Sequence, residues 1–414
     1  MKVLFLVLDG LADISHPELG GMTPLQAAST PILDRLAEEG CCALMYTLEP
    51  GVCPSSEVAH WRMFGFSPEE YPGRAYFHAL SEGVPCQEGD ALFMFNLVPV
   101  TRRGGDVYVV DENVSATAEF CALCAVDLEA AAPPGMELHY VGGIEFLAVV
   151  EKGSPHVLPS DPFLHHLPVG EIAPQPGWEE DEDTVRTVRL LREFKDRAER
   201  AVAGKAGLGG HQAGLIMKWP SRAMSPLSFR DRYGMVAAAV VSTPCFRGMG
   251  SFLGMRVVAM GKKEAGADLG AKLGAVREWF REGGDFAFVH TKHADEAAHA
   301  GDPRGKAEVI EAMDRALGEH AELAFSPEVL TLVTCDHSTP TTRDPRVIHG
   351  GDPVPVLFHA PTVRKDAVRR FDEVSAAGGG MGQLRGEDLM PLVLYFSRRA
   401  PYGVYHRIYL VELH

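Results

Sequence analysis

The stretch from Thr331 to Pro340 constrains the fold of this chain more than any other. It reads TLVTCDHSTP, so an apolar, strand-like run passes directly into the pair Asp336-His337 and then into a turn. A buried strand of an open α/β sheet delivers functional side chains at its carboxyl end in this way. A carboxylate and an imidazole both bind Zn²⁺ or Mn²⁺, but two ligands do not complete a site. The stretch therefore predicts an α/β fold in which other strand ends supply further ligands.

The bulk composition limits the kinds of partner. The chain has 414 residues with a formal net charge of −17, which argues against binding to nucleic acid or to an anionic membrane because both need a basic face. No apolar run approaches the ~20 residues of a membrane-spanning helix. The opening run, residues 3–8, ends at Asp9-Gly10 without a cleavage site, so it is predicted to be a buried strand and not a signal peptide. The eight cysteines lack regular spacing, which indicates a reducing, cytoplasmic location.

The first part of the chain offers a carboxylate and a hydroxyl at element ends. Asp9 follows the first predicted strand, and a capped amphipathic helix is expected over residues 31–39. Ser56 stands where a turn opens into a helix. A serine there lies beside free backbone N–H groups and suits a nucleophile that handles an anion. The alternative is an ordinary N-cap serine, which is the commoner use.

The middle of the chain changes character near residue 86. Strands are expected over 91–100, 106–110 and 136–151, with a helix over 117–128, so this region is predicted to be an α+β insertion. A charged helix over 181–204 is of the kind that bridges domains. From residue 213 the buried-strand pattern returns, and the segments 214–217 and 235–241 are expected to resume the core sheet.

The second half supplies more ligand-type residues. A strand over 285–290 leads into a segment in which Asp295 and His299 are four residues apart. On a helix they share one face and can reach one metal, although a solvated polar face has the same pattern. His349 lies on a Gly-rich turn before a strand over 356–359. A lone loop histidine would carry little weight without the others.

Taken together, these positions provide three carboxylates, three imidazoles and a hydroxyl, enough for two metals. They are Asp9, Ser56, Asp295, His299, Asp336, His337 and His349. Two divalent ions about 4 Å apart can hold an attacking alkoxide and neutralise phosphoryl oxygens, which is the two-metal solution to phosphoryl transfer. The sequence thus predicts a site for two metal ions, an arrangement that suits phosphoryl transfer.

These residues also occur in motifs that resemble a known family, the cofactor-independent phosphoglycerate mutases, in particular their archaeal-type branch within the alkaline phosphatase superfamily. The resemblance rests on ordered motifs in residues 1–85 and 205–414. They are Val7-Leu8-Asp9-Gly10, Thr30-Pro31-Ile32-Leu33-Asp34, Ser56-Glu57-Val58-Ala59-His60, Gly73-Arg74, Asp295-Glu296-Ala297-Ala298-His299, Asp336-His337-Ser338-Thr339-Pro340, His349-Gly350-Gly351-Asp352 and Arg385-Gly386-Glu387-Asp388.

The resemblance implies a fold and a site. The fold would be an alkaline phosphatase-like, mostly parallel sheet flanked by helices, formed by residues 1–85 and 205–414, with residues 86–204 as an inserted cap domain. Ser56 would be the nucleophile that carries the phosphoryl group, without 2,3-bisphosphoglycerate. One ion, Mn²⁺ or Zn²⁺, would be held by Asp295, His299 and His349. The other would be held by Asp9, Ser56, Asp336 and His337.

The resemblance further implies a small phosphorylated acid as substrate, with 3-phosphoglycerate and 2-phosphoglycerate interconverted. The expected substrate-binding cations are Arg74, Arg102, Arg103 and Lys292. The cap lacks the arginine-rich segment of the family, so a related phosphohydrolase or phosphotransferase acting on another small phosphate or phosphonate is the alternative. A non-catalytic binding protein is disfavoured because every metal position is filled. A sulfatase is disfavoured because the nucleophile lacks the Cys/Ser-x-Pro-x-Arg pattern.

Overall fold

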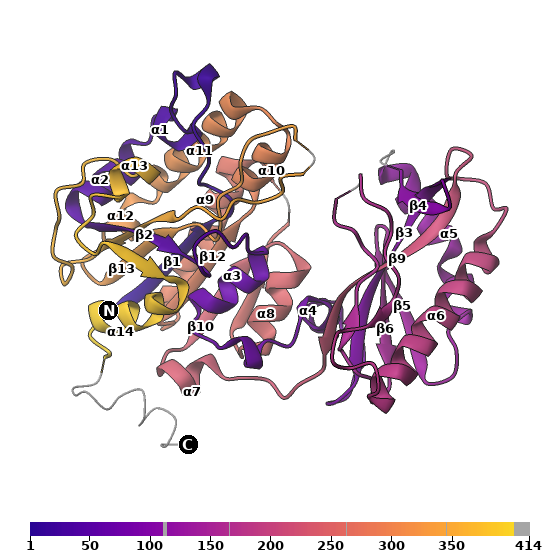
Figure 1. Cartoon of the computed structure of the whole chain (residues 1–414). Helices are drawn as coiled ribbons and strands as arrows, with labels where there is room; N and C mark the ends of the chain where they lie inside the picture. Colours follow the sequence, from indigo (N-terminus) through magenta and orange to yellow (C-terminus); the bar gives the residue numbers. More distant parts are fainter. Residues whose placement is uncertain (111–113, 165, 262, 345, 401–414) are drawn as a thin grey trace. The chain divides into compact units, whose positions relative to one another are not determined.

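The computed structural model describes residues 1–110, 114–164, 166–261, 263–344 and 346–400. They form two compact units, each described here by itself (Figure 1). The core unit comprises Met1–Tyr71 and the chain from Leu227 onward, and the inserted unit comprises Pro72–Pro226.

The core unit is built on an eight-stranded sheet with the order β11-β10-β12-β1-β13-β14-β2-β15. The five neighbouring strands β11, β10, β12, β1 and β13 are parallel to one another, whereas β14 runs antiparallel to both of its neighbours, β13 and β2. The strands are β1 (Lys2–Leu8), β2 (Cys41–Tyr46), β10 (Ala237–Val241), β11 (Arg256–Ala259), β12 (Phe286–Thr291), β13 (Val329–Thr334), β14 (Val354–His359) and β15 (Gln383–Arg385). The mostly parallel α/β sheet expected from the sequence is confirmed.

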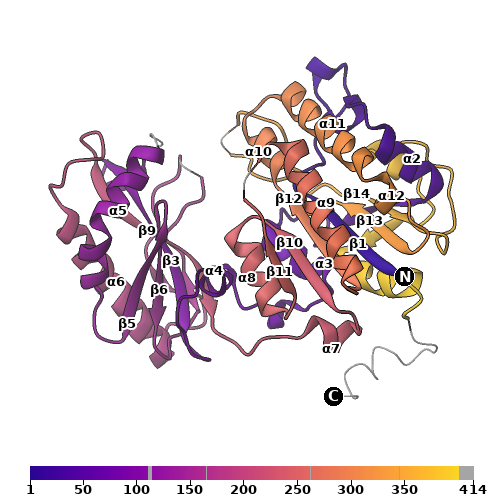
Figure 2. The same cartoon turned by 180° about the vertical axis from the view of Figure 1, so that it is seen from behind.

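Helices cover both faces of this sheet, which is why its central strands are continuous apolar runs. Helices α3 and α8 lie in front of the sheet in Figure 1, and α9 and α11 lie in front of it in Figure 2. The helices of the core unit are α1 (Pro24–Ala27), α2 (Pro31–Glu39), α3 (Ser56–Met63), α7 (Phe229–Tyr233), α8 (Pro244–Phe252), α9 (Ala265–Arg281), α10 (His293–His299), α11 (Pro303–Glu319), α12 (Ala321–Ala324), α13 (Glu373–Ala376) and α14 (Leu389–Phe396). The helix predicted over 31–39 is confirmed as α2.

The inserted unit is an antiparallel sheet with helices on one face. Its long strand β3 pairs with β9 along one edge and with β6 and β4 along the other. Two helices, α5 and α6, bury their apolar residues against one face of the sheet (Figure 1). The elements are α4 (Arg74–Glu82), β3 (Ala91–Arg103), β4 (Asp106–Val109), α5 (Val114–Ala130), β5 (Met136–Gly142), β6 (Glu145–Val150), β7 (Val157–Leu158), β8 (Ala173–Pro174), α6 (Glu182–Val202) and β9 (Gln212–Arg222).

Two expectations about the insertion are wrong. The segment 214–217 does not resume the core sheet, because it lies in β9 and pairs with β3 of the inserted unit. The charged helix over 181–204 is α6, whose apolar face, including Leu191 and Phe194, is buried within the inserted unit instead of bridging two domains. The inserted unit is therefore longer than expected at both ends: it begins at Pro72 and ends at Pro226, whereas the expected cap covered residues 86–204. Helix α4 belongs to the inserted unit because it packs on β9 and β3.

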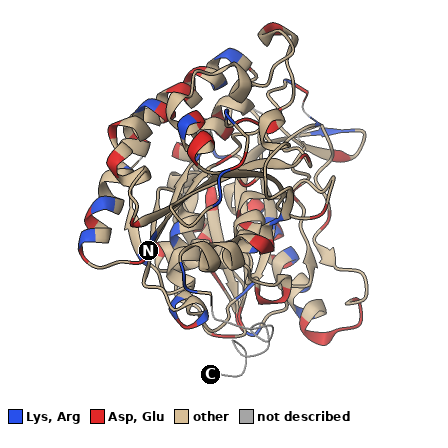
Figure 3. Cartoon of the chain, turned by 90° about the vertical axis from the view of Figure 1, so that its left-hand side faces the viewer, with Lys and Arg blue, Asp and Glu red and all other residues tan. Residues whose placement is uncertain are grey.

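Three further features concern membrane-spanning helices, cysteines and surface charge. No helix of the described residues is long and apolar enough to cross a membrane. All eight cysteines lie in the described part of the chain and are free thiols. Cys121 and Cys124 are buried in the core of the inserted unit. Acidic and basic residues alternate along the outer helices in Figure 3.

Candidate active site

The predicted ligands of the core unit meet at one edge of its sheet. Asp9 directly follows β1, Asp336 and His337 follow β13, and Asp295 lies on α10, which follows β12. Strands β12, β1 and β13 are parallel neighbours, so their carboxyl ends lie side by side. The topology therefore brings together residues that are more than three hundred positions apart in the sequence.

Gly10 allows the three segments to approach closely. Its φ of +64° is in the left-handed region, and a Cβ at this position would lie 2.5 Å from Thr339 Oγ1 and 2.7 Å from Asp295 Cβ. Its N–H donates to Asp336 Oδ1 at 3.1 Å. Only glycine fits here without displacing two residues of the site.

Three carboxylates are buried together at this edge. Asp9 and Asp336 are fully buried and Asp295 is 1% exposed. Burial, together with the charges of Asp9 and Asp295, raises the pKa of Asp336 well above its ordinary value. Asp9 Oδ1 and Asp336 Oδ2 are both buried and have no hydrogen-bond partner among the described residues. Buried carboxylate oxygens without donors are costly, and a divalent cation satisfies both charge and coordination.

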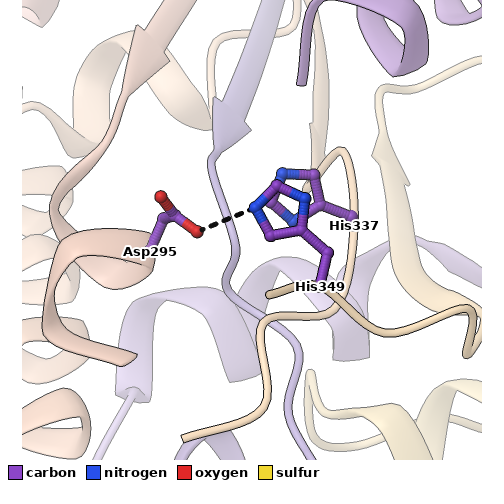
Figure 4. A group of neighbouring side chains, drawn as sticks. All are labelled: Asp295, His337 and His349. Carbon is purple, nitrogen blue, oxygen red and sulfur yellow. Dashed lines mark ion pairs between the residues drawn. The ribbon is translucent and has the colours of Figure 1, made fainter. Parts of the chain in front are cut away.

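Two compact groups of ligand-type atoms are present. Asp295, His337 and His349 form one, and Asp9, Asp336 and His337 form the other. Figure 4 shows His337 and His349 lying one over the other, with Asp295 facing His349. The two rings stack at 3.7 Å, and His349 Nε2 lies 3.7 Å from Asp295 Oδ1. His337 thus lies where the two groups meet.

His337 is held in the neutral form that ligates metals, and the hydrogen bonding of His349 orients its ring toward the site. Burial lowers the pKa of His337 to about 3. His349 Nδ1 donates to the carbonyl of Pro54 at 2.8 Å, which leaves its Nε2 lone pair directed at the site. His299 Nε2 lies 3.3 Å from Asp295 Oδ1, but the compact group at Asp295 contains His337 in place of His299.

Ser56 lies at the first position of α3, and Ser55 is the N-cap residue. Ser56 Oγ is 3.0 Å from His337 Nε2. On the other side of the ring, His337 Nδ1 is 3.1 Å from Thr339 Oγ1, which donates to Asp295 Oδ1 at 2.9 Å. Because the Thr339 hydroxyl proton goes to Asp295, its oxygen accepts from Nδ1, and Nε2 is the nitrogen that can accept the serine proton.

Lys292 supplies positive charge to the carboxylates. Its Nζ donates to Asp295 Oδ2 at 2.8 Å and lies 3.4 Å from Asp9 Oδ2. These anions raise the pKa of Lys292 against the effect of its burial. One ammonium cannot balance three carboxylates, which again favours bound cations.

Sequence reasoning missed two buried histidines that support the site. His290 Nε2 lies 3.0 Å from Asp9 Oδ2, and His60 Nδ1 lies 2.6 Å from the carbonyl oxygen of Ser56. Burial lowers the pKa of both rings, so each donates as a neutral imidazole. His60 and His290 also pack on each other and on Phe246. His290 ends the strand predicted over 285–290, so the strand-end rule applied to Asp9 would have found it.

We expect His290→Ala to weaken metal binding. The hydrogen bond from His290 orients the Asp9 carboxylate, and loss of such an outer partner costs roughly 10- to 100-fold in metal affinity. Isothermal titration of the metal-free protein with Mn²⁺ measures this directly. His359→Ala, at a buried histidine of β14 that faces Glu39, is the matched control and should leave the affinity unchanged. Equal affinities for His290→Ala and the wild type would contradict the role of His290.

A second buried network fixes the loops that carry the ligands. The Asp13 carboxylate accepts from Lys306 Nζ at 2.9 Å and from the Thr341 N–H at 2.9 Å. Lys306 is fully buried and also donates to the carbonyls of Ala12 and Thr339. The loop after β1, the loop after β13 and helix α11 are thereby tied together around the site.

The arginines expected to bind substrate lie in the inserted unit. Arg102 and Arg103 are exposed neighbours near the end of β3. Arg102 lines a cavity of about 710 Å³ together with residues of α6, of the loop that follows it and of the start of β9. Arg103 lies 5.8 Å from the ring of Tyr108. Arg74 begins α4, and its guanidinium lies 3.9 Å from the ring of Trp219.

Comparison with known proteins agrees with this geometry. Residues 1–395 match the family described as the Metalloenzyme superfamily. A protein of Methanopyrus kandleri named 2,3-bisphosphoglycerate-independent phosphoglycerate mutase is 35% identical, and the match covers 94% of each chain. The correspondingly named mutase 2 of Methanocaldococcus jannaschii is 32% identical over 97% of this chain and 94% of that protein.

Solved structures have the same architecture. A protein of Pyrococcus horikoshii superposes with a TM-score of 0.76 and 26% identity, covering 97% of this chain and 98% of that one. The cofactor-independent phosphoglycerate mutase of Thermoplasma acidophilum superposes with a TM-score of 0.62 and 25% identity, covering 96% and 100%. Nearly complete coverage in both directions, with a buried acidic site at the sheet edge, shows that this chain belongs to the 2,3-bisphosphoglycerate-independent phosphoglycerate mutases of the metalloenzyme superfamily.

Proposed function

We propose that this protein interconverts 3-phosphoglycerate and 2-phosphoglycerate by metal-dependent phosphoryl transfer through a phosphoserine, without 2,3-bisphosphoglycerate. The observation that carries the proposal is the position of Ser56 Oγ, 3.0 Å from His337 Nε2 and beside a cluster of buried carboxylates. Full-length relatives with the mutase name support it. A cytoplasmic location remains a prediction.

The site fits two divalent ions, Mn²⁺ or Zn²⁺. One would be held by Asp295, His299 and His349, and the other by Asp9, Ser56, Asp336 and His337. Buried carboxylate oxygens without donors and neutral imidazoles are the donor set that such ions prefer. When bound, the ions supply the positive charge that favours a serine alkoxide and neutralises the phosphoryl oxygens.

The residues of the chain then account for the transfer. Ser56 Oγ attacks phosphorus and forms a new P–O bond while the bond from phosphorus to the glycerate oxygen breaks, and the proton lost by Ser56 ends on the departing glycerate oxygen. Lys292, beside Asp9 and Asp295, is a candidate for binding the phosphoryl oxygens. The released glycerate must stay bound, turn and attack the phosphoserine with its other hydroxyl, which restores Ser56. Water must be kept out during this step, because water attack would give free phosphate.

Recognition of the glycerate is assigned to the inserted unit, whose candidate cations are Arg74, Arg102 and Arg103. The cap lacks the arginine-rich segment of the family, and this departure favours the alternative reading of a phosphohydrolase or phosphotransferase acting on another small phosphate or phosphonate. Both chemistries need the same metals and the same nucleophile, so the core unit does not separate them.

A product assay separates the two readings. We expect the Mn²⁺- or Zn²⁺-loaded protein to convert 3-phosphoglycerate into 2-phosphoglycerate with little free phosphate, because a mutase retains the intermediate acid. The two phosphoglycerates are resolved by ³¹P NMR, which also reports inorganic phosphate. Free phosphate as the main product, or no conversion of either isomer, would instead support the alternative.

A further inference from the structure

Helix α9 of the core unit carries a buried ion pair that the proposed reaction does not use. Asp268 and Lys272 lie one turn apart on this helix, and Lys272 Nζ is 2.6 Å from Asp268 Oδ2. Asp268 is 2% exposed and Lys272 is 1% exposed. Burying two charges is costly, and a buried ion pair is often no more stabilising than apolar residues of the same volume. Stability alone therefore does not explain the pair.

The ammonium of Lys272 reaches the carboxyl end of β12. Its Nζ donates to the carbonyl oxygen of His290 at 2.7 Å. The neighbouring strand on this side is β10, and the last pair in the register of the two strands is Val240 with Val289. The His290 carbonyl lies one residue beyond that pair. Lys272 thus supplies the hydrogen-bond donor where the ladder with β10 has ended.

On its other side the same strand end is held by β1. The N–H of Asp9 donates to the carbonyl of Thr291 at 3.0 Å, and the register of β1 with β12 continues to Thr291. Successive carbonyls of a strand point to opposite sides, so the His290 carbonyl points away from β1 and toward Lys272. The end of β12 is consequently fixed by a strand on one side and by a single side chain on the other.

Two groups of the candidate active site depend on where β12 ends. The His290 imidazole lies 3.0 Å from Asp9 Oδ2. Two residues later, Lys292 Nζ donates to Asp295 Oδ2 at 2.8 Å and lies 3.4 Å from Asp9 Oδ2. A shift of the strand end would move both groups relative to the buried carboxylates.

A cavity beside the strand end leaves room for such a shift. Its volume is about 200 Å³, and its lining includes Lys272, His290 and Lys292, with Ser242 and Thr243 from the chain that follows β10. Close packing normally prevents backbone movement in a protein interior. Packing is incomplete on this side of β12, so the hydrogen bond from Lys272 replaces it.

We propose that Lys272, oriented by Asp268, is a positioning residue that holds the end of β12 and thereby sets the place of the Lys292 ammonium. The inference rests on the proposed function, in which Lys292 binds the phosphoryl oxygens. An ammonium that is fixed before the substrate arrives needs no reorganisation during the reaction. A misplacement of about 1 Å is enough to cost roughly a hundredfold in rate.

The test measures how tightly the full chain binds inorganic phosphate at saturating Mn²⁺, by isothermal titration. The variant Asp268→Asn/Lys272→Met removes both charges together and leaves no unpaired buried charge. We expect it to weaken phosphate binding by about tenfold or more, as for loss of a charge-assisted hydrogen bond from a misplaced Lys292. Asp268→Asn alone keeps the shape of the side chain, and it takes the place of the double substitution if that variant does not fold.

The matched control is Arg277→Met/Glu322→Gln. Arg277 is also on α9, and its guanidinium is 2.7 Å from Glu322 Oε1. This pair lies near the amino ends of β1 and β13, at the opposite edge of the sheet from the carboxylates. Removing it should leave the phosphate affinity at the wild-type value.

A double-mutant cycle with Lys292→Met separates positioning from a general loss of structure. If Lys272 acts through Lys292, combining the two changes should weaken phosphate binding no more than Lys292→Met does alone. Losses that add, or an unchanged affinity without the Asp268–Lys272 pair, would overturn the inference. A loss that does not add supports it even if the product assay detects no isomerisation, so the positioning role and the proposed function can fail separately.

Discussion

Ser56→Ala is expected to reduce the rate of 2-phosphoglycerate formation by at least about a thousandfold, because it removes the atom that carries the phosphoryl group. The substitution deletes one oxygen, which lies 3.0 Å from His337 Nε2, and leaves the other ligand-type side chains in place. Initial rates with saturating 3-phosphoglycerate and Mn²⁺ measure the effect. Circular dichroism and Mn²⁺ titration of the variant show whether the fold and the metals remain.

Ser55→Ala is the matched control, one residue away. The Ser55 side chain makes no capping hydrogen bond to the helix, and its hydroxyl donates to Glu57 Oε1 at 2.8 Å. We therefore expect Ser55→Ala to keep most of the wild-type rate. Mass spectrometry of protein quenched during turnover locates the phosphoserine, and phosphate found on Ser55 in place of Ser56 would reverse the assignment.

Asp336→Ala is expected to lose at least one metal ion per chain and, with it, the activity. Asp336 Oδ2 is buried without a donor, and the carboxylate is a member of the group with Asp9 and His337. Elemental analysis after reconstitution with Mn²⁺ or Zn²⁺ should find close to two ions per wild-type chain. A wild-type value near zero, or the same value for the variant, would refute the bimetallic site.

Metal removal should also lower the stability of the wild type more than that of Asp336→Ala. A bound ion stabilises the folded protein by about 2.7 kcal/mol when the free ion is at a hundred times its Kd. Chelation removes this stabilisation and leaves the three carboxylates facing one another. Thermal unfolding with and without EDTA measures the difference. Asp344→Ala is the control. Asp344 lies, like Asp336, between β13 and β14, but its carboxylate is paired with Arg346, so this variant should respond to EDTA as the wild type does.

Several of the candidate ligands could be predicted from the sequence because they stand where an apolar run stops. Asp9 directly follows a continuous buried strand, Asp336 and His337 come within three residues of the end of another, and parallel strands bring their carboxyl ends to one edge. Asp295 and His299 share a helix face, and they are 3.3 Å apart in the structure. Local periodicity is enough to locate residues at the ends of strands. If the strands are parallel, their carboxyl ends lie at one edge of the sheet, and these residues come together.

Which strands pair, and which side chains contact the candidate ligands, depends on contacts that local sequence patterns do not encode. The strand over 214–217 is apolar in either sheet, and only its pairing with β3 shows that it belongs to the inserted unit. His290 on Asp9, and Lys272 on the carbonyl of His290, join residues brought together by sheet pairing and packing. By itself the sequence determined the α/β class and predicted most of the ligand-type residues that the structure groups at the sheet edge. The tertiary structure alone decided the extent of the inserted unit and the side chains that support the site, because these follow from register and packing between distant segments.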